Sequence, residues 1–308
     1  MTFRGMMKRG LAIAAAGLAF TTMGMGQAAG QLDPNDPTDA VKMARKLHCS
    51  LEDAKPIVYQ WKGRLYSRVQ GERDRHLFNL LGMNVRTCGT VTNEARGYGY
   101  RMVSREIMLY LDPRTNEVLR SWENPWTGKT VDVIHVANDP VNSRGATHAV
   151  GRDGTPFRFY GRFAGGRVFA SFEVPLFYTN ALGGDYQPYV GNYYHAMEMF
   201  NFIIDEDDLL DGGKDTASTA VVTWGRLAQW LPWMEMGARP GIMVANATGR
   251  KLPSWDDLDP VMIAEIDANY PVYREPPPLD DTRPNETSWT YFKKILDARQ
   301  KDTQEGGH

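Results

Sequence analysis

Strand-like segments separated by tight turns fill the middle of this chain and limit how it can fold. Residues 102–111, 117–123 and 129–136 have strand patterns, and turn signals at residues 112–116 and 124–128 separate them. Connections this short join antiparallel neighbours, because parallel strands need a long crossover. We therefore expect an antiparallel meander in this region.

The strand pattern continues on both sides of the meander. A hairpin is predicted over residues 157–174, with its turn at Ala164, Gly165 and Gly166. Other strands are predicted at residues 191–204, 220–229, 241–247 and 57–69, the last interrupted at Gly63, and residues 77–81 are predicted to form a short helical turn. About eight or nine strands with short connections favour a sheet that curls or closes, because this removes exposed edges.

Helices are expected only near the two ends. Asp36 can cap a helix that begins at Pro37, and residues 256–269 and 289–299 have helical patterns. Residues 301–308 are predicted to be a disordered polar tail. The expected fold is mainly β (α+β), a curled antiparallel sheet or β-barrel with peripheral N- and C-terminal helices.

The N-terminus has the layout of a secretory signal peptide over residues 1–30. Arg4, Lys8 and Arg9 precede an apolar run from residue 11 to 20, and small residues follow up to Gly30. This run is too short to span a membrane, so we expect a periplasmic protein without stable membrane insertion after signal removal, with a retained anchor as the alternative. The predicted organisation is a single mainly-β domain over residues 31–275, then a proline-rich segment, short helix and tail over 276–308.

Cys49 and Cys88 are the only cysteines. An oxidising compartment would permit a disulfide between them, and two buried thiols are the alternative.

Charge and motifs exclude several functional classes. The formal net charge is −2 and the chain has no basic run, which argues against nucleic acid as a partner. No phosphate-binding or dinucleotide-binding glycine motif and no zinc-protease motif occurs in a fitting context. We therefore expect neither a nucleotide cofactor nor a metal.

Residues 157–201 are unusually rich in aromatic side chains. Ring faces can line a cavity for a planar ligand, and they can equally pack as core. His195 and Glu198, near the end of this stretch, are the leading acid/base candidates because both types of side chain exchange protons near neutral pH in suitable surroundings. In a strand, Tyr194 and Glu198 would share one face and His195 the other.

His135 is a further catalytic candidate because it precedes a turn at Asn138, Asp139 and Pro140, where strands often present functional groups. Ordinary turn structure is the alternative.

A substrate-binding set completes the candidates. Trp224 and Arg226 would share a strand face, so the guanidinium could hold a phenolate oxygen while the indole stacks on a ring. Trp126, Asn124 and Tyr178 are assigned to the same set. For each candidate, a purely structural role is the competing interpretation.

Four segments, residues 121–142, 159–178, 189–203 and 223–241, resemble the bacterial family called domain of unknown function 1838. The resemblance extends from about Val58 to Pro276. Its members are often exported, and it implies no established reaction and no assigned catalytic residue.

The residues together favour an exported enzyme that acts on a small aromatic or phenolic compound by acid/base chemistry without a redox cofactor. A lyase fits best, cleaving a carbon–carbon bond and releasing a small carbonyl such as formaldehyde from a lignin-derived aromatic. The alternative is a non-catalytic periplasmic carrier for an aromatic ligand. A third interpretation is a structural envelope protein whose rings are only core.

Overall fold

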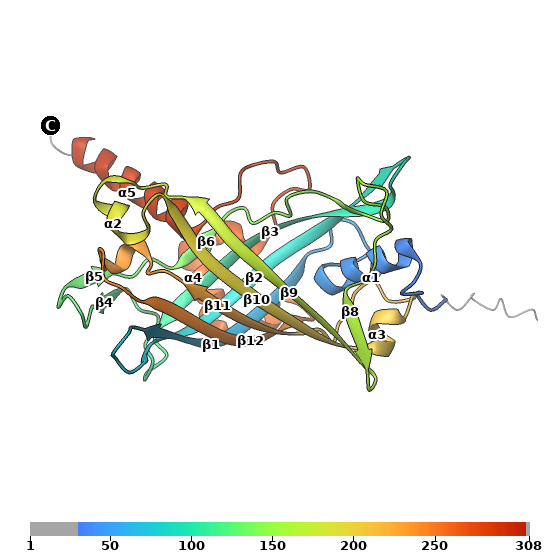
Figure 1. The fold of residues 1–308 in the computed structure, drawn as a ribbon, viewed down its shortest axis with the longest axis horizontal. Coiled ribbons are helices and arrows are strands. Elements are labelled where there is room, and N and C mark those ends of the chain that lie inside the picture. Colours follow the sequence, from blue (N-terminus) through green and yellow to red (C-terminus); the bar gives the residue numbers. More distant parts are fainter. Residues whose placement is uncertain (1–29, 306–308) are drawn as a thin grey trace, which may run out of the picture.

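The computed structural model describes residues 30–305 and contains one large antiparallel sheet flanked by short helices (Figure 1). The strand order is β6-β3-β2-β1-β12-β11-β10-β9-β8, and β7 adds to β3. Its ten strands are β1 (Ile57–Arg68), β2 (Arg75–Asn93), β3 (Gly97–Leu111), β6 (Val136–Asn138), β7 (Thr147–His148), β8 (Gly161–Ala164), β9 (Arg167–Thr179), β10 (Tyr193–Asp205), β11 (Val221–Ala228) and β12 (Ile242–Leu252). The mainly-β, antiparallel prediction is confirmed. Within residues 30–305 no ladder joins β6 to β8, so the sheet is curled and open.

One face of the curled sheet is turned inward. Side chains alternate between the two faces of a strand, so every second residue points the same way. Leu65 of β1, Phe78 of β2, Tyr110 of β3, Tyr194 of β10 and Trp224 of β11 all belong to one hydrophobic cluster. Strands that are not neighbours in the sheet therefore contribute to a common interior.

The opposite face of β2 and β3 is covered by α4 (Pro260–Asn269). Leu81 and Ile107 pack there against Met262 and Ile266, which are fully buried. The predicted helix over 256–269 begins later than expected, because residues 255–257 form a separate 3-10 turn and Pro260 starts the α-helix.

The N-terminal helix α1 (Pro37–His48) covers one end of the interior and forms as predicted (Figure 1). Oδ1 of Asp36 accepts a 2.9 Å hydrogen bond from the Asp39 amide, and Pro37 occupies the first helical position. Directly after the helix, Cys49 forms a disulfide with Cys88 of β2. Of the two alternatives for these cysteines, the structure has the disulfide.

The C-terminal helix α5 (Ser288–Glu305) covers the other end of the interior. Trp289 and Phe292 are buried in the core cluster that also contains Tyr194. The predicted disordered tail is wrong as far as Glu305, because the helix continues through residues 301–305; residues 306–308 lie outside the described residues.

Three other sequence predictions need correction. Residues 77–81 belong to β2 and are not a helical turn. Gly63 does not interrupt β1: it lies opposite Ala247 in the ladder, and an added Cβ would come within 2.3 Å of the Asn246 carbonyl oxygen, so the close approach of β12 requires glycine. The predicted three-stranded meander does not form as one sheet: β4 (Ser121–Glu123) and β5 (Thr130–Asp132) pair in a separate two-stranded sheet, whereas β6 returns to β3.

The remaining helices are α2 (Gln187–Val190) and α3 (Glu206–Leu210). The predicted signal peptide lies outside the described residues except for Gly30. In the described part of the chain, no helix has both the length and the apolar character needed to cross a membrane.

Candidate functional site

A cross-strand ion pair lies on the inward face of β10 and β11. Glu198 is directly opposite Arg226 in the antiparallel ladder. Nη1 of Arg226 lies 3.4 Å from Oε1 of Glu198, and the two side chains are 17% and 18% exposed, respectively. The pair therefore combines a carboxylate and a guanidinium inside the curled sheet without fully removing either from solvent.

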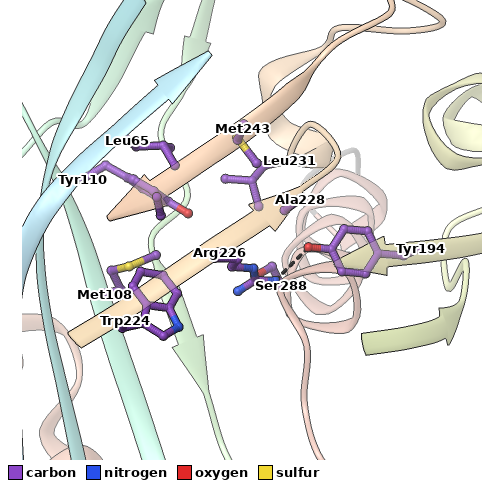
Figure 2. A pocket seen from close by; sticks show the side chains of 11 residues that line it. Leu65, Met108, Tyr110, Tyr194, Trp224, Arg226, Ala228, Leu231, Met243 and Ser288 are labelled. Carbon is purple, nitrogen blue, oxygen red and sulfur yellow. Dashed lines mark hydrogen bonds between the residues drawn. The ribbon is translucent and has the colours of Figure 1, made fainter. Parts of the chain in front are cut away.

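Tyr194 joins this pair from the same strand as Glu198. Its hydroxyl accepts a 2.7 Å hydrogen bond from Nη2 of Arg226 (Figure 2). Tyr194 is 2% exposed, whereas its neighbour His195 is exposed on the other face. The prediction that Tyr194 and Glu198 share a face and His195 does not is confirmed. The sequence-based pairing of His195 with Glu198 therefore does not form one site.

A small cavity lies beside Arg226 and Tyr194. Its volume is about 20 Å³, which is enough for about one water molecule. The walls come from β1, β3, β10, β11, β12 and the start of α5, with Leu65, Met108, Tyr110, Tyr194, Trp224, Arg226, Ala228, Leu231, Met243, Ala245 and Ser288 as lining residues (Figure 2). The cavity places an almost entirely apolar wall behind the guanidinium.

Glu106 of β3 is a second carboxyl group at this site, and the sequence did not identify it. Oε1 of Glu106 accepts a 2.8 Å hydrogen bond from Nδ2 of Asn138, its partner in the β3–β6 ladder. Burial is the largest cause that raises the pKa of Glu106, and the negative charge of Glu198 raises it further, while Asn138 and Arg226 act in the opposite direction. A carboxyl group with a raised pKa is suited to hold and donate a proton.

Charges around Arg226 keep it protonated. Burial acts to lower its pKa, but Tyr194 and Glu198 outweigh burial and raise the pKa above its ordinary value. Arg226 is thus a fixed cation with one nearby carboxylate and one phenolic hydroxyl. Such a group can stabilise an oxyanion.

Aromatic rings continue along the inward face beyond the ion pair. Trp224 precedes Arg226 by two residues on β11, and its indole lies 6.3 Å from that of Trp61, measured between ring centroids. Phe172 of β9 stacks on Phe200 at 5.1 Å and on Phe202 at 5.8 Å. Phe172, Phe200 and Trp61 are only partly buried, so this aromatic wall (Trp61, Phe172, Phe200, Phe202) remains accessible in part. These rings pack against the two core clusters of the sheet, and the prediction that they line a cavity for a ligand stays a prediction.

The remaining predicted catalytic residue, His135, lies apart from the ion pair. Its Nδ1 accepts a 3.1 Å hydrogen bond from the Tyr110 amide, and its ring is 4% exposed. Burial lowers its pKa to about 4. His135 is therefore neutral at pH 7 and supports the backbone of β3.

The predicted substrate-binding residues divide into two groups. Trp224 and Arg226 lie on one inward face, and Tyr178 is opposite Tyr194 in the β9–β10 ladder. Asn124 and Trp126 lie in the β4–β5 turn, where Asn124 Nδ2 donates to the Met234 carbonyl oxygen at 2.7 Å. The turn that contains Asn124 and Trp126 lies beside a wide surface depression of about 460 Å³. These two residues are therefore not part of the Glu198 site.

Metal ligands do not gather in the described residues: between 30 and 305 there is no group of three or more His, Cys, Asp or Glu side chains that could hold an ion. The site is therefore built from two carboxyl groups, one guanidinium, one phenol and aromatic walls.

The protein is thus an open, curled antiparallel sheet that carries the ionic cluster of Glu198, Arg226 and Tyr194 on its inward face. The chain belongs to the family described as Protein of unknown function (DUF1838), whose model matches residues 54–296. This confirms the resemblance recognised in the sequence. A comparison with curated proteins gave no match.

Proposed function

We propose that this protein is an exported, cofactor-independent lyase that acts on a small phenolic compound through the Glu198–Arg226–Tyr194 cluster. The observation that carries the proposal is the position of this cluster: a carboxylate, a fixed cation and a phenol lie together next to Trp224 on the inward face of the sheet.

The proposed reaction releases formaldehyde from a phenolic compound that carries a hydroxymethyl group. The phenolate first expels a leaving group from the benzylic carbon of its para side chain, which breaks the carbon–oxygen bond there and gives a quinone methide. Glu198 then accepts the hydroxymethyl proton, the C–O bond becomes the carbonyl of formaldehyde, and the electron pair of the broken C–C bond restores the aromatic phenolate. The products of the two steps are an alkene, formaldehyde and the protonated leaving group, so the reaction consumes no oxidant or reductant.

Each residue of the cluster has a role in this scheme. Arg226 and Tyr194 hold the phenolate oxygen, because a cation and a hydroxyl both stabilise negative charge in a partly buried site. Glu106 supplies a proton to the leaving group, because burial and Glu198 keep its pKa raised. Trp224 supplies the stacking surface. Export is supported by the disulfide between Cys49 and Cys88, which is a bond typical of oxidising compartments.

The test is a turnover assay with residues 31–308. The substrate is a 1,2-diarylpropane-1,3-diol with a free para-phenol, and its para-methoxy analogue is the control that cannot form a quinone methide. We expect formaldehyde and a stilbene in equal amounts from the phenol only, with and without chelator. The Glu198→Gln variant should lose turnover, whereas Glu173→Gln, which changes an exposed carboxylate on β9, should not.

A non-catalytic carrier is the outcome that would replace this proposal. In that case the phenol would raise the melting temperature of the wild-type protein and no product would form. Loss of turnover only on addition of chelator would contradict the metal-free scheme.

A further inference from the structure

Arg86 of β2 lies on the same inward face as the ion pair, toward α1. Its guanidinium is stacked over the ring of Tyr59, with 4.9 Å between the guanidinium carbon and the ring centroid. Nε donates a 2.6 Å hydrogen bond to Oδ1 of Asn84. Nη1 has only the sulfur of Met102 at 3.9 Å, and Nη2 has no hydrogen-bond partner within residues 30–305.

The lack of a carboxylate distinguishes Arg86 from comparable arginines. Arg45, Arg105 and Arg226 are also largely buried, and they pair with Asp53, Asp139 and Glu198 at 2.7, 2.8 and 3.4 Å, respectively. In the described part of the chain Arg86 forms no such pair, although it is partly buried. A buried cation normally has a counter-ion, because desolvating an unpaired charge is costly.

Glu106 is a carboxyl group that acts on Arg86, but burial raises its pKa, and within residues 30–305 it forms no ion pair with Arg86. Burial, together with the charges of Arg86 and Lys251, lowers the pKa of His48 to about 3, so this imidazole is neutral at pH 7. Nε2 of His48 is 3.1 Å from the Tyr160 hydroxyl, while its Nδ1 is buried without a partner. Lys251 lies over the same Tyr59 ring at 5.6 Å and brings a further amino group. Burial lowers the pKa of Lys251 well below its ordinary value, and its Nζ donates to the Lys46 carbonyl and to Oγ1 of Thr216, so this end of the interior is rich in hydrogen-bond donors.

The aromatic wall connects Arg86 with the ion pair. His48 contacts Phe172 and Phe202 edge-on, and Phe202 contacts Tyr59, on which Arg86 lies. Phe200, at the other end of the stack, is opposite Trp224, which shares the inward face of β11 with Arg226. Glu106 is near enough to both ends for Arg86 and Arg226 each to influence its pKa.

We propose that Arg86 binds the carboxylate of an aromatic ligand whose ring lies on the Phe172, Phe200 and Phe202 part of the aromatic wall. The free edge of the guanidinium matches a carboxylate, which accepts two parallel hydrogen bonds from it. The ring of the ligand replaces water on the wall, and its other end lies toward Glu198 and Arg226. This inference rests on the proposed function for that second end, and it narrows the substrate class to aromatic acids.

The test compares an acid with its amide. The probes are 4-hydroxycinnamate and 4-hydroxycinnamamide, and binding is measured by calorimetry on residues 31–308 of the wild type, Arg86→Met and the control Arg64→Met, which removes an exposed arginine of β1. We expect wild type and the control to bind the acid roughly 10- to 100-fold more tightly than the amide, because a hydrogen bond to a charged group is worth about 1.5–3 kcal/mol. Arg86→Met should bind both probes with equal, weak affinity.

Two results would overturn the anion site. One is equal affinity of wild type for acid and amide, which needs no variant and so does not depend on folding of Arg86→Met. The other is an Arg86→Met protein that prefers the acid as strongly as wild type.

The formaldehyde assay separates this inference from the proposed function. Turnover of the neutral phenolic diol in wild type, with no preference for the acid, would retain the lyase and remove the anion site. A preference for the acid that depends on Arg86, without turnover of any phenol, would retain the anion site and remove the lyase.

Discussion

The hydroxyl of Tyr194 accepts a 2.7 Å hydrogen bond from Nη2 of Arg226, the residue whose other terminal nitrogen faces Glu198. One guanidinium thus links two residues of β10 that are four positions apart. This relationship exists because alternate residues of a strand point the same way, and the neighbouring strand places Arg226 directly opposite Glu198, from where its side chain also reaches Tyr194.

Replacing Glu198 by Gln removes the proposed base but keeps the shape of the side chain. We expect turnover of the phenolic diol to fall by roughly 10²- to 10⁴-fold, the usual contribution of a general base. Steady-state formaldehyde release measures the effect, with Glu173→Gln as the matched control on β9. A variant that is folded and retains more than a tenth of wild-type turnover would remove Glu198 from the mechanism.

The two neighbours Tyr194 and His195 should respond oppositely to substitution. Tyr194→Phe removes the acceptor for Arg226, so we expect turnover to fall about tenfold or more. His195→Ala changes an exposed side chain on the outer face, and turnover should stay within about twofold of wild type. The reverse order of effects would mean that the outer face performs the chemistry.

The disulfide between Cys49 and Cys88 joins α1 to β2 across a sequence separation of 39 residues. Chain-entropy arguments give a stabilisation of about 4 kcal/mol for a loop of this size. We expect the double substitution Cys49→Ser and Cys88→Ser to reduce the free energy of unfolding by roughly this amount in urea titrations. Adding a reductant should destabilise the wild type and leave the double variant unchanged.

Buried His135 should make stability depend on pH. Burial lowers its folded-state pKa to about 4 from an ordinary value of 6.5, although the charge of Glu265 opposes this. Between these values the unfolded chain binds the proton more readily, so stability is lost as pH falls from 6.5 to about 4. The loss from this group is about 3 kcal/mol at the acid end.

The matched variant for this effect is His135→Asn, whose side-chain oxygen can accept from the Tyr110 amide without titrating in this range. Urea midpoints measured at pH 7, 6, 5 and 4 should fall less steeply for the variant than for wild type. Identical pH profiles would show that His135 does not contribute to the acid lability.

Trp289 of α5 is 1% exposed, and its indole lies 5.8 Å from the ring of Tyr194, measured between centroids. Trp289→Ala should lower the free energy of unfolding by about 3–5 kcal/mol, because it leaves a cavity in the core. Urea denaturation measures this change. Truncation to Ala at Tyr291, which lies on the same helix but is only partly buried, should cost less.

Much of the fold could be predicted because its signals are local. The capping of α1 by Asp36 and the hairpin of β8 and β9 depend on residues close in the sequence. Residues 77–81 misled the prediction, because a short apolar run is compatible with both a turn of helix and a buried strand. The division of the meander depended on β6 pairing with β3, which no local pattern encodes.

The candidate site was predictable only in part for the same reason. Strand periodicity placed Tyr194 with Glu198, and the pairing of β10 with β11 then brought in Arg226. Glu106 and Arg86 reach the interior from β3 and β2, and only the curl of the sheet brings these strands near β10 and β11. A single sequence contains no signal for an approach across the interior.

The position of β1 between β2 and β12 has a consequence for how the protein matures. Val58 pairs with Leu252, so β1 lacks one neighbour until nearly the whole chain has been synthesised. Pairings between residues so distant in sequence form slowly, because a long loop must close before any contact compensates its entropy. An unpaired β1 meanwhile offers a free edge to other chains. Refolding yield should therefore fall with protein concentration, and a chaperone that covers this edge would increase the yield of native protein.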